Sequence, residues 1–147
     1  MRKLLALIPI AALALAPPAA NAASKHAVVK TRMTSLGTVL VDSHGHTLYL
    51  FRKDTGRRSH CSGSCAQAWP PLLTRAKPKA RGGAKQSMLS TSRRANGKRQ
   101  VLYNGHPVYR YAFDSAPGDT FGEGLNAFGA RWFVVAPSGR AVTSSSP

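Results

Sequence analysis

Short runs that alternate apolar with polar residues recur along the chain, and turns rich in glycine separate them. Residues 28–33 and 38–42 have this strand pattern, and residues 132–135 repeat it near the other end of the sequence. Asn104-Gly105 is typical of a two-residue hairpin turn, because both of its positions favour positive φ. The pattern predicts a mainly β protein with only short helical turns.

The chain matches itself without gaps when it is shifted by sixty residues. The densest block places residues 45–54 on residues 105–114, with glycine, histidine, tyrosine and aspartate identical at matching positions. At the same offset Val41 falls on Val101. A repeat of this length indicates a duplicated supersecondary unit. We therefore expect two tandem pseudo-repeats of about three to four antiparallel strands each, packed into one domain.

The first 22 residues have the pattern of a secretory signal peptide. A basic start precedes an apolar run at residues 4–16, which is too short to span a bilayer, and residues 20–22 (Ala-Asn-Ala) have the small-x-small pattern of a cleavage site. No cysteine lies there to carry a lipid anchor. We expect a soluble secreted or periplasmic domain without a transmembrane segment. It covers residues 23–147, with copy one at about 26–74, a basic linker at about 75–86 and copy two at about 87–140.

Each copy contains the strand motif Tyr-x-aromatic-x-x-Asp. The motif residues are Tyr49, Phe51 and Asp54 in copy one, and Tyr109, Tyr111 and Asp114 in copy two. Because side chains two apart share one face of a strand, we expect the aromatic face, including Phe113, to pack inward. Each aspartate is interpreted as structural, ending its strand in a side-chain-to-backbone turn or accepting a hydrogen bond from a neighbouring tyrosine. A pair of ligand-binding carboxylates is the alternative.

The chain has two cysteines, Cys61 and Cys65. In an exported protein a pair this close is most simply a disulfide. A redox-active thiol pair is the alternative, but the spacing is one residue longer than Cys-x-x-Cys and no thioredoxin-like βαβ pattern surrounds it. At the matching positions copy two has Phe121 and Leu125. We expect this apolar pair to take the place of the disulfide.

Lysine and arginine outnumber the acidic residues by 21 to 5, so the surface should attract polyanions and anionic membranes. Basic residues concentrate at 75–99, of which 75–85 is interpreted as a flexible linker. The candidate polyanion contacts are Arg93, Arg94, Lys98 and Arg99. Because the segment lacks interleaved aromatic residues and the chain is exported, we expect anionic cell-wall polymers or lipid headgroups as partners, and no specific nucleic acid.

Further motifs carry a resemblance to a known family. They are residues 61–71 (Cys-x3-Cys-Ala-x-x-Trp-Pro-Pro), residues 103–109 (Tyr-Asn-Gly-His-Pro-Val-Tyr), residues 117–120 (Pro-Gly-Asp-Thr) and residues 128–132 (Phe-Gly-x-x-Trp). With the strand motif they resemble the secreted-repeat family of predicted bacterial lipoproteins, which is named for its Tyr-x-(Phe/Trp/Tyr)-x-x-Asp motif. The resemblance implies an envelope or secreted protein in tandem copies, without an established molecular function. This chain departs from the family in lacking the lipidated cysteine.

The candidate metal ligands are His44, His46, His60 and His106. With the cysteines they could bind Cu or Zn or ligate haem, although hairpin-turn chemistry accounts for three of them and no Cys-x-x-Cys-His motif occurs. Asp114, Asp119 and Glu123 form an acidic patch without a recognised calcium-loop spacing. No nucleophile, metalloprotease or phosphate-loop motif occurs, so no catalytic residue is predicted.

The sequence therefore predicts a non-catalytic envelope module, monomeric and without a cofactor, that binds an anionic partner. The alternative function is extracytoplasmic redox or metal handling, with Cu or haem held by the histidines and cysteines.

Overall fold

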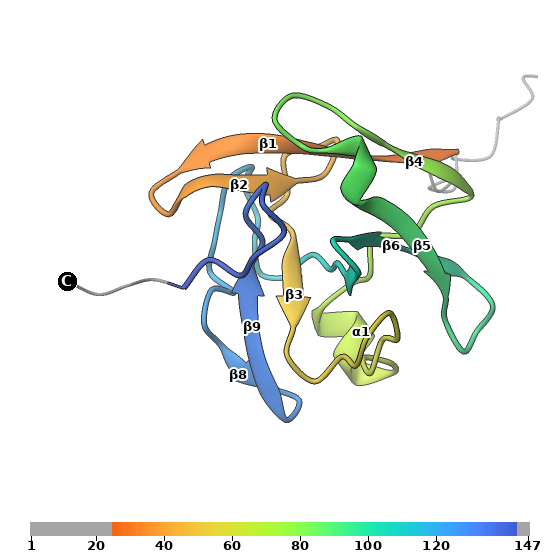
Figure 1. Cartoon of the computed structure of the whole chain (residues 1–147). Helices are drawn as coiled ribbons and strands as arrows, with labels where there is room; N and C mark the ends of the chain where they lie inside the picture. The colour runs from red at the N-terminus through yellow and green to blue at the C-terminus, as the bar shows by residue number, and fades with distance from the viewer. Residues whose placement is uncertain (1–24, 144–147) are drawn as a thin grey trace, which may run out of the picture.

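The strands of the protein form three small sheets around a shared core (Figure 1). The computed structural model describes residues 25–143. Its strands are β1 (His26–Thr34), β2 (Gly37–Val41), β3 (Tyr49–Phe51), β4 (Ala76–Ala80), β5 (Leu89–Arg93), β6 (Arg99–Tyr103), β7 (His106–Pro107), β8 (Asn126–Ala127) and β9 (Ala130–Val134). Its helical elements are α1 (Ser64–Ala68) and the 3-10 helix η1 (Gln86–Met88).

The sheets have the orders β2-β1-β4, β5-β6-β7 and β3-β9-β8, and the last one joins strands of both copies. The predicted class, a mainly β domain of two pseudo-repeats with short helical turns, is confirmed. The predicted signal peptide lies outside the described residues.

Each copy begins with an antiparallel hairpin, β1–β2 in copy one and β5–β6 in copy two. The carbonyl of Leu40 accepts the amide of Leu48, and the carbonyl of Val101 accepts the amide of Val108. Leu48 and Val108 are matching positions of the strand motif, so Leu40 corresponds to Val101. The predicted match of Val41 with Val101 is therefore wrong by one residue.

Two turns of unequal length cause this shift. The β1–β2 turn encloses residues 35–36, whereas the β5–β6 turn encloses residues 95–97. The turn after β2 encloses residues 43–45, whereas the turn after β6 encloses only Asn104-Gly105, at the predicted positive φ of 50° and 79°. Copy two therefore has one extra residue in its first turn and one residue fewer in its second, and the two differences cancel. As a result, a shift of sixty residues aligns the copies correctly before and after β6 but is wrong by one residue within β6.

The segment expected to be a flexible linker contains strand β4, which pairs in parallel with β1. Its side chains alternate, with Lys77 and Lys79 exposed and Pro78 buried between them. The strand covers an edge of β1 that would otherwise leave backbone groups unpaired. The Ala-Lys-Pro-Lys-Ala sequence of β4 has the composition of a linker. The segment is a strand because its backbone pairs with the edge of β1.

The aromatic face of each motif strand packs inward as predicted, except at its far end. The buried aromatic residues of this face are Tyr49, Phe51 and Tyr109. Phe113 is 71% exposed, contrary to the prediction. The chain turns after Tyr111, where the carbonyl accepts the amide of Asp114, so the period-two rule of a strand no longer holds there.

The expected apolar substitute for the disulfide is also wrong. Phe121 and Leu125 are 65% and 37% exposed. The tight position in this loop belongs to Gly122, where a Cβ atom would lie 2.8 Å from the Trp69 ring and 2.9 Å from the Tyr49 ring. Copy two thus fills the space beside these rings with backbone instead of a side chain.

Candidate functional site

The segments that carry the two strand motifs meet at the centre of the molecule, where residues of one copy bond to residues of the other. The amide of Tyr49 bonds the carbonyl of Tyr109 at 2.8 Å, and the reverse bond is 3.0 Å. The Tyr49 hydroxyl donates to Oδ2 of Asp114 at 2.5 Å, and the Tyr109 hydroxyl donates to Oδ2 of Asp54 at 2.8 Å. The tyrosine of each copy therefore binds the aspartate of the other copy.

The second oxygen of each aspartate holds the loop that follows it. Oδ1 of Asp54 accepts the amide of His60 at 2.7 Å, and Oδ1 of Asp114 accepts the amide of Phe121 at 3.0 Å. Burial raises the pKa of both carboxyl groups, while the hydrogen bonds that they accept act in the opposite direction. These bonds match the structural role predicted for both aspartates.

Burial also raises the pKa of both tyrosines, Tyr49 and Tyr109, far above the ordinary value. The acceptor carboxyl groups act in the same direction, because a phenolate would lie beside a carboxylate. Both phenols therefore stay protonated and act as hydrogen-bond donors at any physiological pH.

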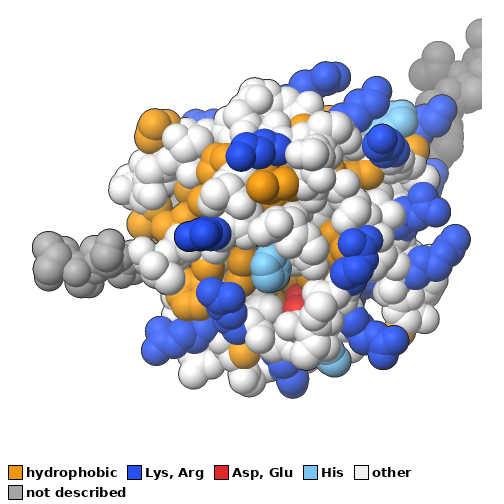
Figure 2. Space-filling model, viewed as in Figure 1, with side chains coloured by type: hydrophobic (Ala, Val, Ile, Leu, Met, Phe, Trp, Pro, Cys, Tyr) orange, Lys and Arg blue, Asp and Glu red, His pale blue; other side chains and the backbone are white. Residues whose placement is uncertain are grey.

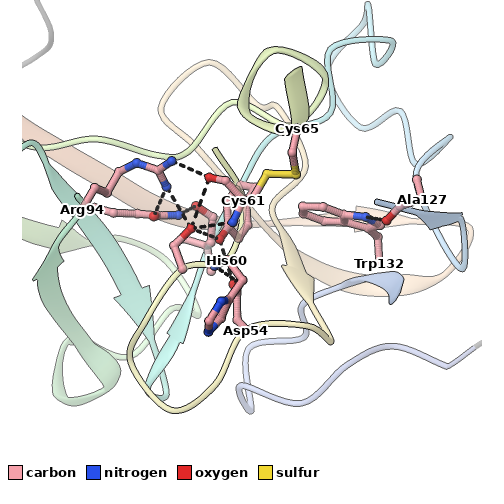
Figure 3. The surroundings of a disulfide bond; sticks show 11 residues. Asp54, His60, Cys61, Cys65, Arg94, Ala127 and Trp132 are labelled. Carbon is pink, nitrogen blue, oxygen red and sulfur yellow. Dashed lines mark hydrogen bonds between the residues drawn. A yellow bond between two sulfur atoms is a disulfide. The ribbon is translucent and has the colours of Figure 1, made fainter. Parts of the chain in front are cut away.

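Four aromatic rings stack in a column beside these bonds, and they too come alternately from the two copies. Their order is Phe51, Trp132, Trp69 and Tyr111, with successive ring centroids 4.0, 3.9 and 4.2 Å apart. The Trp132 indole N–H donates to the carbonyl of Ala127 at 3.0 Å (Figure 3). The column is part of the core and leaves no ring of either tryptophan open to a ligand, since both are only 1% exposed or less.

Cys61 and Cys65 form the predicted disulfide, with an S–S distance of 2.02 Å (Figure 3). Both residues are buried, at 1% and 5% exposure, in the same cluster as the tryptophans. The bridge closes the loop that follows Asp54 and ties it to α1, which contains Cys65. Its burial fits a structural bond and gives no support to a redox site.

Arg94 contacts this loop from the β5–β6 hairpin instead of facing solvent. Its guanidinium donates to Ser59 Oγ at 3.0 Å, to Gln100 Oε1 at 2.7 Å and to the carbonyl of Cys61 at 2.5 Å (Figure 3). These internal acceptors make Arg94 a bridge between the two copies. Of the four arginines and lysines expected to contact a polyanion, Arg94 is thus the one that faces inward.

The other three predicted cations line an open hollow of about 550 Å³ on the β5–β6 hairpin. The residues that line it are Leu73, Thr74, Arg75, Arg93, Gly97, Lys98 and Arg99. Four of these seven residues are cationic and none is acidic. Figure 2 shows that Lys and Arg side chains gather on the side of the molecule that carries β5 and β6, with almost no acidic side chain on that face.

Two short segments position the cations of the hollow. The amide of Thr74 bonds the carbonyl of Arg99 at 3.0 Å, which fixes the segment after Pro71 against β6. The Arg93 guanidinium donates to the carbonyl of Gly97 at 3.2 Å across the hairpin turn. The arrangement can bind an anionic group through several cations that are held close together, since guanidinium groups donate to phosphate and carboxylate oxygens in pairs.

The comparison with protein families identifies both copies. The model of a family described as a secreted repeat of unknown function matches residues 30–73 and 90–136. These segments of 44 and 47 residues make up 91 of the 147 residues. The chain belongs to this family of secreted repeats. No curated protein and no solved structure matches the chain.

Each matched segment of the secreted repeat contains one motif strand and one tryptophan of the stack. The contacts between copies therefore join the two family units to each other. Among residues 25–143, no helix is long and apolar enough to cross a membrane.

The histidines of the secreted repeat do not converge on one site. His44 and His46 lie in the loop after β2, beside Asp42. His60 Nε2 lies 2.8 Å from Thr55 Oγ1. His106 is half-buried in β7, and burial lowers its pKa, as does the nearby Arg52 guanidinium. Within residues 25–143, only one group of three potential ligands has its ligand atoms within 4.8 Å of one another, and it is Asp42, His44 and His46.

The acidic patch of copy two supports turns and a strand. Oδ2 of Asp119 accepts the amides of Ser115 at 3.0 Å and Ala116 at 2.8 Å. Oε2 of Glu123 accepts the amide of Val134 at 2.6 Å. These carboxylates thus act as internal acceptors.

Sequence reasoning missed Asp42 and Arg75. Asp42 is 3% exposed and directly follows β2. Aspartate is common in turns at this position, so the sequence gives no sign that this one belongs to a site. Arg75 belongs to the segment interpreted as a linker, and its place in the hollow depends on the pairing of that segment with β6. The high charge of residues 75–99 was the only available signal for Arg75.

Proposed function

We propose that this secreted repeat is a non-catalytic envelope module that binds an anionic cell-wall polymer. The binding site is the hollow lined by Arg75, Arg93, Lys98 and Arg99, and this concentration of positive charge carries the proposal. Without Arg2 and Lys3 of the predicted signal peptide, 19 of the 21 basic residues remain against 5 acidic ones, so their field would draw a polyanion toward the molecule, and the hollow would give it a defined place to bind.

A polymer fits the hollow better than a lipid surface does. Among the described residues that line it, Leu73 is the only large apolar one. The exposed large apolar side chains among the described residues, Met33, Phe113, Phe121, Leu125 and Phe128, do not line it. A membrane-binding face would combine its cations with apolar side chains that enter the lipid.

Binding of a labelled phosphate-backbone wall polymer by fluorescence anisotropy tests the proposal. The test variant R75Q/R93Q/K98Q removes three exposed cations from the hollow. The matched control K53Q/R131Q/R140Q removes three exposed cations that do not line it, so both variants have the same net charge. We expect the test variant to bind at least about tenfold more weakly, the control to bind nearly as well as the parent, and affinity to fall steeply as salt rises.

Equal losses in the two variants would show that binding depends on overall charge and would refute a defined site in the hollow. Binding that ignores salt would also contradict the proposal. Vesicles with anionic headgroups serve as the competing partner, and tighter binding to them than to the polymer would overturn the choice of a polymer.

A further inference from the structure

The loop between β2 and β3 brings a carboxylate and two imidazoles together, apart from the cationic hollow. Asp42, His44 and His46 place their ligand atoms within 4.8 Å of one another. We propose that this loop binds one divalent transition-metal ion, Zn²⁺ or Cu²⁺, through these three side chains. The inference is independent of polymer binding, which uses other residues.

The carboxylate of Asp42 is fixed in place before any ion arrives. Its Oδ1 accepts the amide of His44 at 2.8 Å and the amide of His46 at 3.0 Å. Both amides belong to the loop that carries the other two ligands, so the same bonds that orient the carboxylate also hold the loop. Outer hydrogen bonds of this kind orient the first ligands of metal sites.

The facing ligand atoms of Asp42 and His46 have the spacing of a metal centre, and an ion would replace the hydrogen bond that joins them. Oδ2 of Asp42 lies 3.3 Å from Nδ1 of His46. Two ligands at about 2.0–2.1 Å from a tetrahedral ion are roughly 3.3 Å apart, so an ion fits between these atoms. His44 is exposed, and its ligand atom already lies within 4.8 Å of those of Asp42 and His46. Two imidazoles and one carboxylate suit Zn²⁺ and Cu²⁺ better than Mg²⁺ or Ca²⁺, which prefer oxygen ligands.

A cation beside the site opposes the ion and gives a sharp test. The Arg110 guanidinium lies 3.7 Å from Oδ2 of Asp42, and its side chain is 38% exposed. Removal of this charge should therefore tighten metal binding. If the loop had only a structural role, a variant without the Arg110 charge would bind no metal ion.

Copy two cannot form the same site, so the stoichiometry should be one ion per chain. Tyr103 occupies the position that corresponds to Asp42, and the turn that follows is one residue shorter. His106 is the only histidine in that turn or in β7.

Isothermal titration of the purified protein with ZnCl₂, and separately with CuCl₂, tests the site. We expect the parent protein to bind one equivalent of metal ion. The affinity should be at least tenfold lower in His44→Ala and in His46→Ala, and severalfold higher in Arg110→Gln. It should be unchanged in the controls His60→Ala and His106→Ala. His44 is exposed, so its variant should fold even if a change at buried Asp42 does not. Absence of binding at 0.1 mM metal ion, binding that survives His44→Ala, or binding lost in His60→Ala would each overturn the proposal.

Discussion

The loop after Asp54 in copy one and the loop after Asp114 in copy two hold equivalent places by different means. The first is closed by the Cys61–Cys65 disulfide and is bound by Arg94. The second has no covalent bridge, and Gly122 lets its backbone lie directly against aromatic rings. Both loops nevertheless donate a backbone amide to their aspartate, and both aspartates accept a tyrosine hydroxyl from the other copy.

This difference shows which features the duplicated unit requires. The tyrosine–aspartate bonds and the stacked tryptophans occur in both copies and join them. The disulfide occurs in one copy and reinforces a loop whose position the shared bonds already define. The copies are therefore halves of one interlocked core rather than two independent units.

The largest effect should follow from removal of a stacked tryptophan. Trp69→Ala and Trp132→Ala each leave a cavity in the ring column, which should lower the free energy of unfolding by about 3–5 kcal/mol. Denaturant unfolding measures this loss. Phe113→Ala is the control, because the ring is 71% exposed and its removal should cost less than about 0.5 kcal/mol. A small loss at one tryptophan only would show that the copies contribute unequally to the core.

High pH should destabilise the folded state through the two tyrosines that join the copies. The pKa of Tyr49 and of Tyr109 is raised in the folded state, so the unfolded chain releases these protons first as the pH rises. Their contribution is complete below about pH 10, and above it stability should fall by roughly 2.7 kcal/mol per pH unit for the pair. Urea unfolding between pH 8 and 11 measures this slope. Tyr49→Phe or Tyr109→Phe should each remove about half of it, and an unchanged slope would contradict ionisable donors at these positions.

The disulfide should have a smaller effect than the stack. Cys61→Ala/Cys65→Ala should lower the free energy of unfolding by about 2 kcal/mol, the chain-entropy contribution of a loop this short. The corresponding change in copy two, Phe121→Ser/Leu125→Ser, should change stability by less than about 0.5 kcal/mol, because both side chains are exposed. Thermal melts of the two double variants measure the difference. If both double variants lost the same free energy of unfolding, Phe121 and Leu125 would take the place of the disulfide after all.

The sequence predicts well what depends on local pattern. The hairpin turn at Asn104-Gly105, the motif strand at Tyr49 and the last strand all follow from short-range periodicity and turn chemistry. Local pattern does not predict that each motif tyrosine bonds the aspartate of the other copy. The spacing of these residues in the sequence allows a tyrosine–aspartate hydrogen bond within one copy as well as between the copies. β4 was missed for a similar reason, since it forms a strand only where the edge of β1 is available.

The candidate hollow was predicted in part. The high charge of the segment indicated Arg93, Lys98 and Arg99, all of which line it. Arg94 was placed wrongly, because neighbouring residues of the hairpin point to opposite faces, and Arg94 points to the Cys61 carbonyl while Arg93 is exposed. A pattern of charges does not reveal which face of a hairpin packs against another loop.

Double-mutant cycles across and within the copies test the interlocked core most directly. The cycle Tyr49→Phe with Asp114→Asn joins residues of different copies, and the cycle Tyr49→Phe with Asp54→Asn joins residues of the same copy. We predict a coupling energy of about 1 kcal/mol or more for the first cycle and less than about 0.5 kcal/mol for the second. Strong coupling within the copy, together with none across the copies, would mean that each half satisfies its own motif and would contradict the exchange of partners.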